Sequence, residues 1–251
     1  MNLYLITGTT KGLGAALRKV LVADAGNRVI TLSRAPTTGL ADGRNTNIHA
    51  DFGAVASLTP AFLQVEQQLT GNTFARAVLI NNAGVVGPVD RFDSLDSMAL
   101  ANNIQVNLAA PMVVTGWFAK TTRGIAAQRL VINISSGAAT RAIAGWSAYC
   151  AAKAGLEMAT RAAALEAAAN DPTLAICSLA PGVVDTPMQG QVRAASEDAF
   201  PDVARFRAMK ADGVLRPAED VACDIVRLID NGRLSNGGNF DLRELIPQSQ
   251  K

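Results

Sequence analysis

The sequence predicts a single α/β domain over residues 1–251, built on a doubly wound parallel sheet of about seven strands. Short apolar runs alternate along the chain with longer segments whose apolar residues recur at helical spacing, which is typical of repeated strand–helix units. The runs are continuously apolar, which indicates strands that helices cover on both faces. With 251 residues and 49% hydrophobic composition, the chain can form one large core.

Seven segments have the apolar, β-branched composition of buried strands. They are residues 3–7, 28–33, 48–50, 77–81, 129–135, 175–179 and 239–242. Five segments between or beside them have helical spacing of apolar residues. They are residues 13–25, 54–69, 96–121 with a break near Pro111, 147–168 and 217–230. The stretch 186–215 has no such pattern and is too long for a plain connection, so we expect a lid over a ligand site.

Charge and cysteine content exclude several classes of protein. The 23 basic and 21 acidic residues nearly cancel, so we expect no nucleic-acid partner. The three cysteines are widely spaced and the chain has one histidine, which predicts free thiols in a reducing compartment and no metal site. An export signal and an apolar run of membrane-spanning length are both absent from the sequence, so we expect a cytoplasmic protein without a membrane partner.

A glycine-rich turn follows the first expected strand and predicts a dinucleotide site. Gly8, Gly12 and Gly14 would let the backbone approach a pyrophosphate at the start of the next helix. At the end of the second strand, an NAD site would have an acidic residue that binds the ribose 2′-hydroxyl. This chain has Arg34 there, and the first acid after it is Asp42. Arg34 and Lys11 together predict a 2′-phosphate and hence NADP(H); alternatively, Arg34 is a solvated surface cation.

Tyr149 and Lys153 form a candidate proton-transfer pair. They stand four residues apart in an expected helix, so their side chains share one face. A phenol titrates near about 10, and an ammonium one turn away favours the phenolate and lowers that pKa towards the working range. Ser136, which follows the fifth expected strand, can hydrogen-bond the same substrate oxygen. Taken alone, the pair could be a chance occurrence, so its meaning depends on the cofactor site.

These features together resemble the short-chain dehydrogenase/reductase family over nearly the whole chain. The resemblance is carried by Thr7-Gly8-x3-Gly12-x-Gly14, Asn81-Asn82-Ala83-Gly84, Asn107, Ser136, Tyr149-x3-Lys153 and Pro181-Gly182. It implies a Rossmann-type fold and four catalytic residues, Asn107, Ser136, Tyr149 and Lys153. Together with the basic residues above, it implies a cofactor site made of Gly8, Thr10, Lys11, Gly12, Leu13, Gly14, Arg34, Asp51, Phe52, Asn82, Ala83, Gly84, Tyr149, Lys153, Pro181, Gly182, Val184 and Thr186.

Within the family, residues 145–153, 180–189 and 235–241 are most similar to sepiapterin reductase and to bacterial benzil-type diketone reductases. Asp241 falls where the pterin-reducing members contact their substrate; a structural aspartate at a strand end fits equally well. Trp146 and Met188 would line the pocket with Ser136 and Tyr149, which would suit a flat or aromatic carbonyl compound. Ordinary packing under a lid is the alternative for these two side chains.

The resulting prediction is an NADPH-dependent carbonyl reductase of ketones or diketones. Tyr149 would protonate the carbonyl oxygen, Ser136 would stabilise the developing oxyanion, and Lys153 would bond the nicotinamide ribose. Asn107 is implied to interrupt its helix and hold a water that links Lys153 to solvent; a helix cap or an interhelix hydrogen bond is the alternative. The same groups could serve an NADP-dependent secondary-alcohol dehydrogenase, and a non-catalytic NADP-binding sensor is a further alternative. The resemblance also implies a homodimer or homotetramer formed through helices 96–121 and 147–168.

Overall fold

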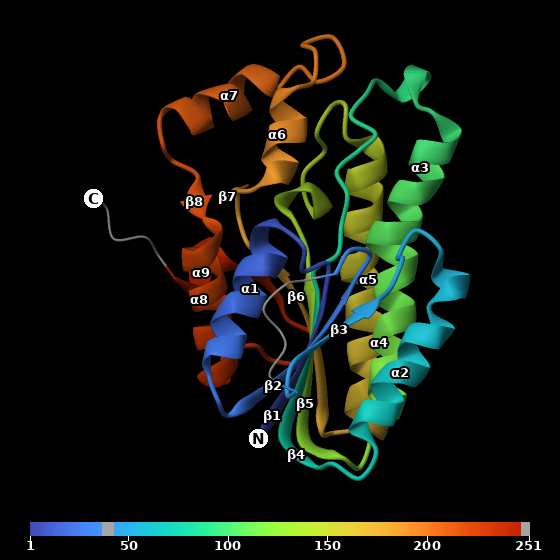
Figure 1. Ribbon diagram of the computed structural model, residues 1–251. Coiled ribbons are helices and arrows are strands. Elements are labelled where there is room, and N and C mark those ends of the chain that lie inside the picture. The colour runs from blue at the N-terminus through green and yellow to red at the C-terminus, as the bar shows by residue number, and fades with distance from the viewer. Residues whose placement is uncertain (37–42, 247–251) are drawn as a thin grey trace.

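The computed structural model describes residues 1–36 and 43–246. Within them, seven parallel strands form one sheet in the order β3-β2-β1-β4-β5-β6-β9 (Figure 1). These strands are β1 (Asn2–Thr7), β2 (Asn27–Ser33), β3 (Thr46–His49), β4 (Phe74–Asn81), β5 (Ala126–Ile134), β6 (Leu174–Ala180) and β9 (Asn239–Asp241). The strand order reverses between β1 and β4, which is where sheets of this kind bind ligands. The predicted doubly wound parallel sheet is confirmed.

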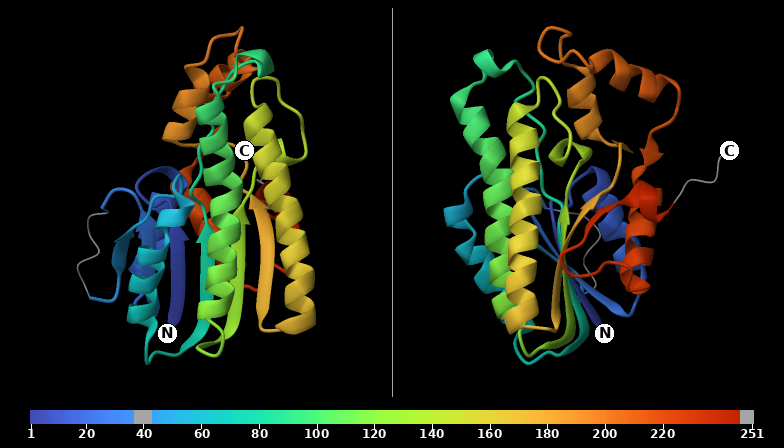
Figure 2. Two further views of the ribbon diagram at one scale, coloured as in Figure 1. Left: turned by 90° about the vertical axis from the view of Figure 1, so that its right-hand side faces the viewer. Right: turned by 180° about the vertical axis from the view of Figure 1, so that it is seen from behind.

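Helices cover both faces of the sheet (Figures 1 and 2). One face carries α2 (Thr59–Leu69), α3 (Ser97–Ile104), α4 (Ala110–Thr121) and α5 (Ser147–Asn170), and the other carries α1 (Gly12–Ala23), α8 (Ala218–Asp230) and α9 (Leu242–Leu245). Successive side chains of a strand point to opposite faces. Leu3 and Leu5 of β1 therefore pack in the core beneath α2 and α4, whereas Tyr4 and Ile6 pack in the core beneath α1 and α8.

The helix expected at 96–121 is interrupted by a π-helical turn at Gln105–Ala109. The break predicted near Pro111 is thus a π-helical turn that ends two residues before this proline, which lies in the first turn of α4. The helix expected at 54–69 begins with a 3₁₀ turn, Val55–Ser57, before α2 starts. Two further 3₁₀ turns lie at Phe92–Ser94 and Gly137–Ala139.

The segment 186–215 lies beyond the carboxyl ends of the strands and contains two helices that the sequence pattern did not predict. They are α6 (Pro187–Arg193) and α7 (Val203–Ala211), at the top of Figure 1. The two ends of the segment are joined, because β7 (Val184–Asp185) pairs with β8 (Arg216–Pro217) in parallel. The two ends of the segment therefore lie side by side. The segment between them extends over the edge of the sheet where ligands bind in this type of fold.

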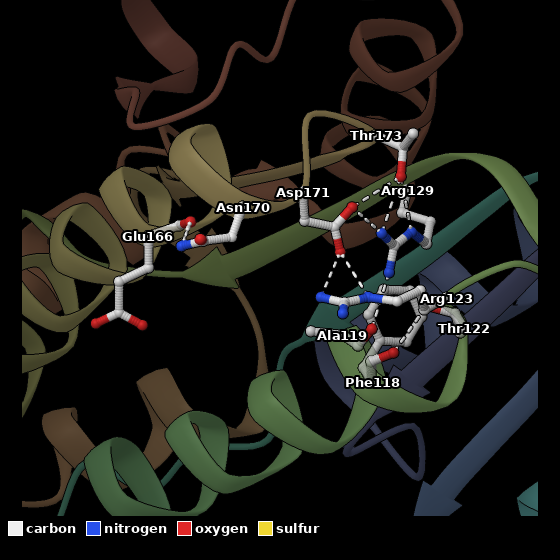
Figure 3. Close-up of polar contacts among 9 residues, drawn as sticks. All are labelled: Phe118, Ala119, Thr122, Arg123, Arg129, Glu166, Asn170, Asp171 and Thr173. Carbon is white, nitrogen blue, oxygen red and sulfur yellow. Dashed lines mark hydrogen bonds and ion pairs between the residues drawn. The ribbon is translucent and has the colours of Figure 1, made fainter.

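A buried ion-pair network lies at the other end of α5, close to the start of β5 (Figure 3). The Asp171 carboxylate binds the guanidinium of Arg129, whose side chain is 1% exposed, and that of Arg123 at 3.1 Å. Thr173 donates a hydrogen bond to the same carboxylate at 3.0 Å, and Arg129 also donates to the carbonyl of Ala119 at 2.8 Å. The network joins α4, β5, the end of α5 and the start of β6, which fixes the base of the long α5 helix.

Over residues 1–36 and 43–246, no helix is both long and apolar enough to cross a membrane. Over the same ranges, His, Cys, Asp and Glu side chains form no group of three or more that could hold a metal ion.

Candidate active site

A cavity of about 630 Å³ opens at the carboxyl ends of the strands, beneath α6 and α7. Every residue expected to hold the cofactor lines this cavity, and so do Ser136, Trp146 and Met188. The fold therefore brings the glycine-rich turn, the catalytic candidates and most of the substrate candidates to one site. Asn107 and Asp241 do not line the cavity.

The glycine-rich turn is pressed against the end of β4. Gly8 has a φ of 72°, and a Cβ atom there would lie 2.7 Å from the Cα of Ala83. A Cβ atom on Gly14 would lie 2.1 Å from the carbonyl oxygen of Gly8, so only glycine allows α1 to begin this close to the turn. The Asn82 side chain donates to the carbonyls of Thr7 and Gly8 at 3.0 and 2.9 Å. The Asn82 amide thus fixes the turn and leaves the start of α1 facing the cavity.

The end of β2 presents a basic residue to the cavity. The Ser33 hydroxyl hydrogen-bonds the carbonyl of Ala35 and the side chain of Asn47, both at 2.8 Å, which fixes the turn after the strand. Arg34 is exposed on this turn and lines the same cavity as Lys11. Asp42, the first acid after Arg34 in the sequence, lies outside the described residues.

Tyr149, Lys153 and Ser136 meet at the centre of the cavity. Tyr149 and Lys153 lie one turn apart on the buried face of α5, with exposed fractions of 8% and 5%. Lys153 Nζ donates to the carbonyl of Ile134 at 2.8 Å and lies 5.8 Å from the centre of the Tyr149 ring. The hydroxyl of Ser136 lies beside that of Tyr149, and both residues line the cavity. The predicted triad is therefore assembled at the end of β5 on the wall of the cofactor-sized cavity.

Burial dominates the titration of this pair. It raises the pKa of Tyr149 above its ordinary value, although the neighbouring Ser136 side chain acts in the opposite direction. Burial also lowers the pKa of Lys153 to about 8, while the nearby Glu157 carboxylate acts to raise it. The expected lowering of the Tyr149 pKa by Lys153 is not found, because the ammonium donates to the main chain and lies over the ring rather than at the hydroxyl. A raised pKa keeps Tyr149 protonated at neutral pH, the form that a proton donor requires.

Asn107 lies in the π-helical turn and holds the loop after β4. Its Oδ1 accepts from the main-chain N–H of Val85 at 3.1 Å, and its Nδ2 donates to the carbonyl of Val85 at 2.8 Å and to Asn103 at 2.9 Å. A Cβ atom on Gly84 would lie 3.0 Å from Asn107 Oδ1 and 4.0 Å from Lys153 Nζ. Asn107 lies in the turn that interrupts its helix, and its amide hydrogen-bonds the loop after β4 rather than another helix. A water link to Lys153 stays a prediction.

Aromatic side chains form one wall of the cavity. Trp146 stacks on Phe200 with ring centres 5.0 Å apart and meets the edge of Tyr149 at 5.5 Å. Phe206 from α7 packs against Trp146 at 5.5 Å and also lines the cavity, as does Met188 from α6. Phe206 was not predicted from the sequence, because the helix that carries it has no clear apolar stripe.

The predicted substrate contact Asp241 is instead bound by an arginine. Arg243 donates to its carboxylate through Nε at 2.9 Å and through Nη2, and these hydrogen bonds hold the pKa of Asp241 below its usual range. Arg243 lines the cavity, together with Arg141 and Arg205. No sequence motif marks these three arginines, so the sequence analysis missed them.

Comparison with known proteins agrees with this geometry. A family model described as short chain dehydrogenase matches residues 2–197. The chain is 36% identical over 243 residues to a Bacillus cereus protein named benzil reductase ((S)-benzoin forming), covering 94% of this chain and 97% of that protein. It is 29% identical over 258 residues to sepiapterin reductase of Bos taurus, covering 96% and 94% respectively. The crystal structure of the KRED1-Pglu enzyme superimposes with a TM-score of 0.81 at 26% identity, over 95% of this chain and 100% of that one.

Proposed function

The chain belongs to the short-chain dehydrogenase family, and we propose that it is an NADPH-dependent carbonyl reductase that converts ketones and diketones to alcohols. As a family member it is an oxidoreductase that acts on CH–OH or C=O groups with a nicotinamide cofactor. One observation supports the proposal of reduction through Tyr149: Tyr149, Ser136 and the buried Lys153 line one cavity together with the glycine-rich turn.

The residues of the cavity fit a dinucleotide phosphate. Glycine at 8 lets the turn pack against Ala83, and glycine at 14 lets α1 begin against the carbonyl of Gly8. The N-terminus of α1 lines the cavity, where its free N–H groups would bind a pyrophosphate. Lys11 and Arg34 line the same end, and a guanidinium suits a 2′-phosphate better than a neutral ribose hydroxyl. These two cations support NADP(H) over NAD(H). The bound nicotinamide would supply the hydride.

The chain's own groups would orient the carbonyl and move the proton. Ser136 and Tyr149 would each donate a hydrogen bond to the carbonyl oxygen, and Tyr149 would give up its proton as negative charge develops there. Lys153 would stabilise the phenolate that remains and bond the nicotinamide ribose. Because the pKa of Lys153 is about 8, this stabilisation is present at neutral pH and is lost as the pH rises through that value.

The aromatic wall supports a flat aromatic substrate. Trp146, Phe206 and Tyr149 offer ring faces and edges beside the proton donor, and aromatic pairs of this geometry add about 0.5–1.5 kcal/mol beyond area burial. A relative at 36% identity is named for benzil, a diaryl diketone. An aryl ketone or diaryl diketone therefore fits the cavity better than a small aliphatic ketone does.

Further parts of the proposal concern the assembly. Residues 1–251 would act as one NADP(H)-binding domain, with 186–215 as a lid tethered by the β7–β8 pair. We expect a cytoplasmic homodimer or homotetramer with contacts through α4 and α5. Their outer surfaces expose apolar side chains that a second copy of the chain could cover, including Met112, Met158 and Leu165.

Loss of NADPH absorbance with benzil, sepiapterin and simple ketones tests the proposal. Turnover of at least one carbonyl compound, faster with NADPH than with NADH, is expected. Tight NADPH binding without turnover of any of them would favour a non-catalytic sensor. Turnover that is efficient only from a secondary alcohol with NADP⁺ would favour the dehydrogenase direction.

A further inference from the structure

Several basic side chains line the cavity, and all but one have an evident partner or role. They are Lys11, Arg34, Arg141, Lys153, Arg205 and Arg243. Lys11 and Arg34 lie at the proposed phosphate end and Lys153 beside the proton donor. Arg205 lies 3.5 Å from the Asp202 carboxylate, and Arg243 is paired with Asp241. Among the described residues, Arg141 is the cavity-lining arginine near Ser136 that has no carboxylate within ion-pair distance. Its charge acts at longer range on Asp241, whose carboxylate Arg243 already binds.

The guanidinium of Arg141 lies against the residue that follows Ser136. The main-chain N–H of Arg141 donates to the carbonyl of Gly137 at 3.2 Å, so the chain turns back at this point. A Cβ atom on Gly137 would lie 2.7 Å from Arg141 Nη2, so any larger residue at 137 would have to displace the guanidinium. The loop thus holds the Arg141 guanidinium beside Gly137, which directly follows Ser136, and the Ser136 hydroxyl would bind the reacting oxygen.

The carboxylate of Asp241 is engaged mainly by Arg243 and does not line the cavity. Its carboxylate accepts from the side chain of Arg243 and from the main-chain N–H of Arg243 at 3.0 Å. The aliphatic part of Arg243 lies 3.4 Å from where a Cβ atom of Gly182 would be, so this side chain also borders the cavity. The cavity itself is lined there by guanidinium groups, which are donors without acceptor capacity.

We propose that Arg141 binds a second oxygen on the carbon next to the reacting carbonyl and thereby selects vicinal dicarbonyl substrates over monoketones. This inference rests on the proposed carbonyl reductase function and deepens it. A planar guanidinium can donate two parallel hydrogen bonds to the two oxygens of a carboxylate, or a charge-assisted hydrogen bond to one keto oxygen. The reacting carbonyl would occupy Ser136 and Tyr149, while the adjacent oxygen would face Arg141. Vicinal diketones and 2-oxo acids share this oxygen, and they differ in its charge.

Three substrates with a common phenyl ketone core test the proposal. Benzil carries a second keto oxygen, phenylglyoxylate carries a carboxylate, and deoxybenzoin has the benzil skeleton without the second oxygen. For the unaltered protein we expect kcat/KM for benzil or phenylglyoxylate to exceed that for deoxybenzoin. In Arg141→Met, the ratio of benzil to deoxybenzoin should fall by about tenfold, the scale of one hydrogen bond to a charged donor. Most of the change should appear in KM, with partial recovery in Arg141→Lys.

Arg161→Met is the matched control, because Arg161 is exposed on α5 and does not line the cavity. It should leave the substrate ratio unchanged. A larger loss for phenylglyoxylate than for benzil would identify the natural group as a carboxylate, and the reverse would identify a keto oxygen. Equal losses on benzil and deoxybenzoin in Arg141→Met, or no loss on either, would overturn the inference and leave the reductase function intact. Turnover of none of the three compounds by the unaltered protein would refute the reductase function and the inference with it.

Discussion

Glu157 should control the pH at which the active site loses its ammonium. It lies one helical turn after Lys153, is 7% exposed, and accepts hydrogen bonds from Ser135 at 2.6 Å and Asn239 at 2.7 Å. Both donors are neutral side chains. It is also the charged side chain that acts to raise the pKa of Lys153 against the effect of burial.

The size of the expected pKa shift of Lys153 follows from its distance to Glu157. Side chains four residues apart on a helix lie about 6 Å from each other. Two unit charges at that separation interact by about 2.8 kcal/mol at an effective dielectric constant of about 20, which corresponds to about two pKa units. Because the hydrogen bonds from Ser135 and Asn239 disperse the carboxylate charge, we expect about half of this effect. Glu157→Gln should therefore lower the pKa of Lys153 by about one unit from its value of about 8.

The pH dependence of kcat for carbonyl reduction measures this shift. An ammonium is lost as the pH rises through its pKa, so the alkaline fall in activity should move to lower pH in Glu157→Gln. Ser135→Ala is the control, since it removes a hydrogen bond to the same carboxylate and keeps the charge. An alkaline limb that is unmoved in Glu157→Gln, or moved equally in both variants, would contradict the electrostatic argument. The pH dependence of NADPH affinity gives a second readout if the variant is slow.

Three further predictions concern stability, cofactor choice and assembly. Asp171→Asn should lower the free energy of unfolding by about 3–5 kcal/mol, or Tm by about 6–20 °C, because it leaves buried Arg129 without its counter-charge. Asp230→Asn is the control at a half-exposed ion pair and should cost about 1 kcal/mol or less. Equal thermal shifts in the two variants would contradict this prediction. Arg34→Glu should weaken NADPH binding by about 10- to 100-fold with a far smaller effect on NADH, and an unchanged preference in fluorescence titrations would refute the cofactor proposal. Leu165→Glu on α5 should reduce the molecular mass in light scattering if α5 forms the subunit contact, whereas an unchanged oligomer would exclude that surface.

The dependence of stability on pH gives a second test of the Asp171 network. Burial acts to raise the pKa of this carboxyl, but the hydrogen bonds from Arg129 and Thr173 outweigh it and hold the pKa below its usual value. A carboxylate with a lowered pKa in the folded state contributes stability above its unfolded pKa, and that stability is lost as the pH falls through the folded value. The stability difference between the unaltered protein and Asp171→Asn should therefore shrink in acid.

The strands could be predicted from the sequence because a buried parallel strand is one continuous apolar run. The predicted core of β4, residues 77–81, is 0–4% exposed, and the structure extends the strand back only to Phe74. The helix α7 could not be predicted in this way, because only Val203 and Phe206 of its nine residues are buried. It is held by contacts with other parts of the chain, such as the packing of Phe206 on Trp146, and not by its own periodicity.

The glycine turn, Asn82 and Ser136 come together because they follow the ends of β1, β4 and β5, which are adjacent in the sheet. Residues whose position depends on a loop conformation could not be predicted. Arg141 reaches the cavity only because the chain turns back after Gly137, and Arg243 reaches Asp241 only through the turn between β9 and α9. The direction of the Tyr149 pKa shift was also beyond the sequence, since spacing gives the distance to Lys153 but not the depth of burial.

The most direct test of the central claim is a single turnover of a carbonyl substrate by Tyr149→Phe with NADPH already bound. The account predicts that NADPH affinity is nearly unchanged while the rate of NADPH oxidation falls by about 100-fold or more, because the proton donor is missing. A rate close to that of the unaltered protein would contradict the assignment of Tyr149 as the proton donor.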